Sequence, residues 1–134
     1  MKKLITMLLA LLITLSFAVP AFAEAMPRLV DQADLLTDAQ EVNLLSKLDT
    51  ISNRQGMDVV IVTAPTLDGK DITPYADDFY DENGYRPDGI LLLIADLERE
   101  WAISTAGYGI TAFTDAGQEY LTEQFFGDLS DGQY

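Results

Sequence analysis

The hydrophobic positions of this chain follow two periods, and the shorter period predicts strands. The runs Asp58–Thr63 and 90–95 are aliphatic on both faces, which is typical of strands inside a sheet that is covered on both sides. Apolar and small side chains alternate over residues 101–105 after a short polar turn, which predicts an antiparallel hairpin with residues 90–95. Residues 28–30 are expected to form a short edge strand.

The longer period predicts helices over residues 38–54, from residue 74 to Asn83-Gly84, and over residues 116–126. Thr37 with Gln40 forms a capping-box pattern, and Gly56 fits the end of that first helix. Thr73 before Pro74 is the expected cap of the second helix. Thr114 or Asp115 is the expected cap of the third. Its expected inner face comprises Tyr120, Leu121 and Phe125, and the expected polar loops are residues 107–109 and 127–132.

The order of these elements predicts one compact, layered α/β domain with a small mixed sheet. Residues 1–23 precede it and have the pattern of a secretory signal peptide. Two lysines are followed by the uncharged run Leu4–Val19 and by Ala21 and Ala23 at small-residue cleavage positions. The alternative is an uncleaved anchor helix, although the run is shorter than the roughly 20 residues of a usual span. We therefore expect an exported domain of residues 24–134 that works outside the cytoplasm.

Composition excludes several kinds of chemistry. The chain has 22 acidic and 8 basic residues, a net charge of −14, and neither His nor Cys. Disulfides, cysteine nucleophiles, Ser-His-Asp triads and HExxH zinc sites are therefore excluded, and no Gly-rich phosphate loop is present. Such an acidic chain repels nucleic acid, so we expect no nucleic-acid partner. Acidic surfaces attract divalent cations, for which oxygen is the preferred ligand.

Five aspartates could supply such ligands from separate segments: Asp31, Asp34, Asp88, Asp96 and Asp115. The predicted hairpin places Asp88 opposite Tyr108, within two residues. Asp88, the glycine-flanked loop Gly107-Tyr108-Gly109 and Asp115 are therefore expected at one edge of the sheet, where the glycines would allow a ligand to approach the backbone. The alternative is that these residues only form turns and helix caps. Trp101 is expected in the core rather than as a platform for a ligand.

An ordered set of segments resembles the TPM domain, an extracytoplasmic module of bacterial membrane-associated proteins, a thylakoid-lumen photosystem repair protein and a nematode receptor modulator. The segments are Arg28–Ala33 with Leu35-Leu36, Val59–Thr63, Ile72–Ala76, Asp88–Ile94, Gly107–Gly109 and Thr114–Ala116. The resemblance implies a three-layer α/β/α sandwich. It also implies an acidic site for Ca²⁺ or Mg²⁺ at Asp31, Asp88 and Asp115, with Asp34 and Asp96 as secondary candidates.

Two functions follow from this resemblance. The first is a divalent-cation-binding accessory module that assists membrane-protein complexes, and the alternative is a metal-dependent acid phosphatase. Arg28 and Arg86 are the only cations expected near a phosphatase site. Pro87-Asp88-Gly89 lacks a polar residue that the family usually carries before this strand. Relatives also continue into a transmembrane helix beyond the position of Tyr134, so we expect a truncated chain, anchored in the membrane if it continues and secreted otherwise. The oligomeric state stays open.

Overall fold

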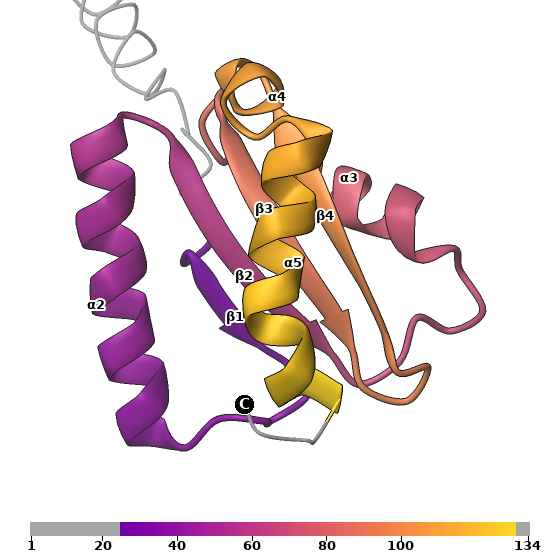
Figure 1. Ribbon diagram of the computed structural model, residues 1–134. Coiled ribbons are helices and arrows are strands. Elements are labelled where there is room, and N and C mark those ends of the chain that lie inside the picture. Colours follow the sequence, from indigo (N-terminus) through magenta and orange to yellow (C-terminus); the bar gives the residue numbers. More distant parts are fainter. Residues whose placement is uncertain (1–24, 131–134) are drawn as a thin grey trace, which may run out of the picture.

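The computed structural model describes residues 25–130, and it contains a four-stranded sheet with helices on both faces (Figure 1). The strands lie in the order β1 (Leu29–Asp31), β2 (Asp58–Ala64), β3 (Gly89–Ala95) and β4 (Glu100–Ala106). β1, β2 and β3 are parallel, and β4 returns antiparallel to β3. The predicted mixed sheet, its hairpin and the three-layer sandwich are confirmed.

Four helices complete the described part of the chain: α2 (Asp38–Gln55), α3 (Ile72–Glu82), α4 (Tyr108–Ala112) and α5 (Asp115–Ser130). In Figure 1, α2 and α5 lie on one face of the sheet and α3 lies on the other. Among residues 25–130, no helix is both long and apolar enough to cross a membrane. The predicted signal segment 1–23, with Ala21 and Ala23, lies outside the described residues.

The start of α2 follows its sequence pattern. The Thr37 side chain accepts a hydrogen bond from the Gln40 amide, and the Gln40 side chain accepts one from the Thr37 amide at 2.9 Å. Gly56 ends the helix in the left-handed region at φ 70°. The predicted cap of the next helix is wrong, because Asp71 rather than Thr73 caps α3 and accepts from the Thr73 amide at 3.2 Å. A carboxylate at N-cap can accept this bond as well as a hydroxyl.

The main core lies between the sheet and α3. Alternate side chains of β2 and β3 point to this side and are at most 1% exposed, namely Val60, Val62, Leu91 and Leu93. Ala76 and Tyr80 of α3 pack on them. The Ser104 hydroxyl of β4 donates to the Asp77 carboxylate at 2.6 Å and joins this edge of the sheet to α3.

The opposite face of the sheet is covered less completely. Its side chains come from the intervening positions of β2 and β3 and from the paired positions of β4. Several of them are only half-buried: Ile61, Leu92, Ile94, Trp101 and Ile103. α2 and α5 both lie over this face (Figure 1). The two faces therefore differ. The face under α3 is a fully buried core, and the other face leaves apolar side chains partly accessible to solvent.

The C-terminal segment differs from the sequence expectation in three respects. Residues 108–112 form α4 rather than continuing the expected loop, and α5 extends to Ser130 rather than ending before residue 127. Gly127 lies within α5, because a single glycine weakens a helix without ending it. Tyr120 is 62% exposed, so it does not belong to the inner face of the helix. Phe125 does face inward, where it contacts Trp101 edge-to-face with 5.8 Å between the two ring centroids.

Candidate functional site

Asp88 lies at the amino end of β3, next to the start of α4. Gly89 pairs with Ala106, so Gly107, which follows β4, lies beside Asp88. This agrees with the position that the hairpin predicted. The Asp88 carboxylate accepts a hydrogen bond from the Tyr108 amide at 2.6 Å. A negative charge that accepts from an amide at the start of a helix stabilises that helix. Asp88 therefore serves as a cap for α4.

Gly107 and Gly109, on either side of Tyr108, allow the start of α4 to pack closely against residues 87–89. Gly107 has φ 53°, and an added Cβ there would collide with the Asp88 carboxylate and with the Pro87 carbonyl. A Cβ on Gly109 would overlap the backbone carbonyl of Gly89. The backbone of residues 107–109 is therefore closely approached, but by residues 87–89 of the same chain and not by a ligand. In the described structure, the expected ligand loop is therefore a packing contact between α4 and the start of β3.

Asp31 lies at the carboxyl end of β1, where it holds the turn into α2. Its carboxylate accepts from the amides of Leu35 at 3.2 Å and Leu36 at 2.8 Å, and from the Thr63 hydroxyl. The Thr63 hydroxyl oxygen in turn accepts from the Ala33 amide at 3.1 Å. Both oxygens of Asp31 thus have donors from the protein, which is the usual arrangement of a structural turn.

The structure places Asp31 and Asp88 at opposite ends of the sheet. Asp31 is the register partner of Thr63 on β2, and Thr63 is the register partner of Ile94 on β3. Ile94 follows Asp88 by six residues. At about 3.3 Å per residue, the two aspartates are about 20 Å apart along the strand direction. Two ligands of one cation cannot be separated in this way, since Ca²⁺–oxygen distances are about 2.3–2.6 Å.

The remaining predicted ligands do not complete a metal centre either. Asp115 begins α5 and is exposed, and α5 begins close to α4 in Figure 1. Asp34 is exposed, and Asp96 follows β3 at the other end, with Asp31. Within residues 25–130, no three carboxylates are grouped so that they could hold a metal ion. The donor set does not fit the single cation site that the resemblance implies.

The structure also contains a buried ion cluster at the amino ends of the strands, which the sequence pattern did not predict. Asp58, 3% exposed, begins β2 and accepts from Arg28 Nε at 2.9 Å, from Arg28 Nη2 at 2.8 Å and from the Arg86 amide at 2.7 Å. Arg28 also binds Asp49 at 2.6 Å. Burial opposes the charge of Arg28, but hydrogen bonds to Asp49 and Asp58 outweigh it and raise the pKa of the guanidinium.

A sequence signal for this cluster did exist. Arg28 directly precedes β1, and Asp58 begins β2. Residues at the amino ends of neighbouring parallel strands are adjacent, so a salt bridge could have been inferred once the strand direction was known.

Burial and the negative charge of Asp58 also raise the pKa of Tyr85 to about 12, so its hydroxyl stays protonated and donates to the Pro27 carbonyl at 2.9 Å. The cluster fixes the chain that leads into β1.

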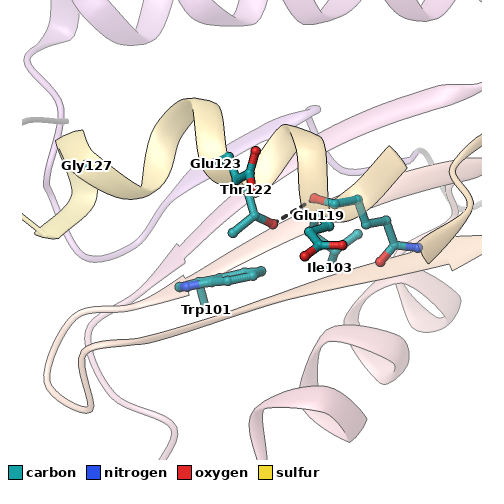
Figure 2. Close-up of a pocket in the computed structure, with 7 residues that line it drawn as sticks. Trp101, Ile103, Glu119, Thr122, Glu123 and Gly127 are labelled. Carbon is teal, nitrogen blue, oxygen red and sulfur yellow. Dashed lines mark hydrogen bonds between the residues drawn. The ribbon is translucent and has the colours of Figure 1, made fainter. Parts of the chain in front are cut away.

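A groove of about 620 Å³ lies between β4 and α5, on the less completely covered face of the sheet. Its lining consists of Trp101 and Ile103 from β4 and of Gln118, Glu119, Thr122, Glu123 and Gly127 from α5. Figure 2 shows Trp101 and Ile103 beneath the helix, with the Glu119 carboxylate over Ile103. The groove thus has an apolar floor and acidic side chains on its helical wall.

Trp101 therefore lies in a different environment from the one expected. It was expected in the core, but it is half-buried and lines the groove while its ring contacts Phe125. Strand alternation alone places Trp101 and Ile103 on one face and cannot say how completely a helix covers that face. Glu119 and Glu123, one turn apart on α5, are both exposed and border this groove.

Comparison with known proteins supports this architecture. The sequence matches the TPM domain over residues 29–134. The N-terminal domain of a P. gingivalis protein, solved by solution NMR, superposes with a TM-score of 0.72 at 21% identity, covering 84% of this chain and 74% of that one. The N-terminal domain of a Corynebacterium glutamicum protein superposes with a TM-score of 0.63 at 20% identity, covering 86% and 73%. No curated protein matches the sequence. The match over most of its length shows that this chain belongs to the TPM domain family.

Proposed function

We propose that this TPM-domain protein is an exported accessory module that binds a protein partner in the groove between β4 and α5. A membrane-protein complex is the partner class that the family resemblance favours. The observation that carries the proposal is the groove itself, in which an indole and an isoleucine side chain are left half-buried beside two glutamates. Apolar floors with polar rims are typical of surfaces that a partner covers.

Divalent cations enter this proposal in a limited role. We propose that Ca²⁺ or Mg²⁺ associates with the acidic surface, which is supported by the net charge of −14. A centre shared by Asp31 and Asp88 is not part of the proposal, because the two lie at opposite ends of the sheet.

The phosphatase alternative receives no support from the described residues. Phosphoryl transfer requires cationic groups around the phosphoryl oxygens. Arg28 and Arg86, the two cations that were expected to serve, are bound to Asp58 in the buried cluster. The geometry therefore favours the binding module.

Site-specific photocrosslinking tests the proposed function. A photoreactive amino acid replaces Glu119 on the wall of the groove, and a matched variant carries it at the exposed Asn43 of α2. Each protein is expressed in its native cells and irradiated, and adducts are identified by mass spectrometry. We expect one discrete protein adduct from position 119 and none from position 43. Adducts equal at both positions, or none at position 119, would contradict the proposal.

A further inference from the structure

β4 forms an edge of the sheet that lacks the usual protection against further pairing. Its seven residues, Glu100–Ala106, pair with β3 in unbroken register, and within residues 25–130 no strand pairs with its other side. Edge strands are normally blunted by lysine, proline, a bulge or short length. β4 has no lysine or proline, and its continuous register leaves no bulge. The other edge, β1, is only three residues long.

The groove lies directly beside this edge. Trp101 and Ile103 share one face of β4, so the alternate side chains of a strand added to β4 would lie next to them. Glu119 and Glu123 border the groove on the same face. Asp77 bonds to Ser104 on the opposite face of β4. The edge is therefore flanked by carboxylates on both faces, and none of the groove-lining residues is a lysine or arginine.

We propose that the groove and the β4 edge together bind an extended, basic segment of a partner protein by strand addition. The inference rests on the proposed function and specifies how the partner is recognised. Backbone groups of the segment would pair with the free side of β4. Apolar side chains at alternate positions would cover Trp101 and Ile103, and flanking lysines or arginines would meet Glu119 and Glu123. Main-chain pairing supplies affinity in this mode, and alternate side chains supply specificity.

Charge argues against a second copy of this chain as the occupant. Pairing β4 with β4 would bring the acidic groove walls of two molecules together, and each molecule carries a net charge of −14. Like charges across an interface oppose association, whereas a basic segment would be attracted to the same surface. A partner segment rich in lysine or arginine is therefore the favoured occupant.

A designed peptide tests this inference on the wild-type protein. The probe has seven residues, the length of β4, in the order Lys-Thr-Val-Thr-Val-Thr-Lys with blocked termini, so one face presents two valines between two lysines. The matched control peptide has glutamate in place of both lysines. Trp101 is the only tryptophan of the chain, so its emission reports occupancy of the groove, while calorimetry reports binding anywhere. We expect binding of the lysine peptide alone, with a change in Trp101 emission.

Backbone pairing is tested by N-methylation of the peptide. Amides of alternate residues point to the same side of a strand, so methylation of one alternate set should abolish binding and methylation of the other should leave it unchanged. The double variant Glu119→Gln with Glu123→Gln should weaken binding by at least about tenfold, since two charge contacts are lost. Asp34→Asn with Asp38→Asn removes the same charge from exposed positions before and at the start of α2 and should have no effect.

The outcomes separate this inference from the proposed function. Equal effects of the two methylated sets, binding without a change in Trp101 emission, or failure of the lysine peptide to bind would overturn strand addition. A protein dimer in sedimentation that the peptide dissociates would assign the edge to a second copy and would also overturn it. A discrete crosslink from position 119 to a different protein would still support the proposed function in each case.

Discussion

Replacement of Asp58 by asparagine probes the buried cluster that holds Arg28 and Arg86. The side chain of Asp58 is 4% exposed, whereas that of its neighbour in the cluster, Asp49, is 47% exposed. Removing one partner of a buried ion pair costs about 3–5 kcal/mol, because the remaining charge is left without compensation. Asparagine keeps the volume and can still accept from the Arg86 amide. We therefore expect the lower end of that range, a loss of about 3 kcal/mol.

The measurement is chemical and thermal unfolding followed by circular dichroism. For a domain of this size, about 3 kcal/mol corresponds to a fall in Tm of roughly 10 °C or more. Asp49→Asn is the matched control, because it removes a charge from the same arginine at an exposed position and should cost less than about 1 kcal/mol. The double variant Arg28→Gln with Asp58→Asn should cost less than the sum of the two single variants, because they share one interaction. Equal, small losses from Asp58→Asn and Asp49→Asn would refute a structural role for the cluster.

Three further predictions concern the ends of the sheet. Gly109→Ala should strongly destabilise the protein, since the new Cβ would overlap the carbonyl of Gly89; unchanged thermal unfolding would show that α4 does not pack there. Hydrogen bonds from the Leu67 amide and the Thr66 hydroxyl lower the pKa of Glu98 below 4.5, despite partial burial. Its stabilising effect is therefore present above about pH 4.5 and is lost as the pH falls through the lowered pKa. Glu98→Gln should flatten that acid loss of Tm, and a melting series between pH 6 and 3 that matches wild type would contradict this. Finally, any effects of Asp31→Asn and Asp88→Asn on the Ca²⁺ titration enthalpy should be additive, because the residues lie at opposite ends of the sheet; a strongly non-additive double variant would restore a shared site.

The sequence predicted the local structure well because the signals are local. The capping box of Thr37 and Gln40 joins groups three residues apart, and the aliphatic runs of β2 and β3 reflect burial on both faces. The hairpin of β3 and β4 is short enough that its turn fixes the register, so the contact between Asp88 and Tyr108 could be foreseen. Such features depend on neighbours in the chain, and the pattern of residue types contains them.

The candidate cation site could not be predicted in the same way. The direction of β1 decides whether Asp31 lies near Asp88 or at the far end of the sheet, and a strand of three residues has no pattern that fixes its direction. Asp31 was grouped with Asp88 because the family resemblance implied an acidic site that included both residues. The parallel pairing of β1, β2 and β3 separates them and instead joins Arg28 to Asp58.

The sequence by itself determined the α/β class, the four strands, the helices α2, α3 and α5, and the fact that Trp101 and Ile103 share one side of β4. Only the tertiary structure decided that α3 seals one face of the sheet while α2 and α5 leave the other partly open. The physical reason is that alternation specifies which side chains face a layer. The completeness of that layer depends on where helices distant in sequence come to rest, and this placement created the groove beside β4.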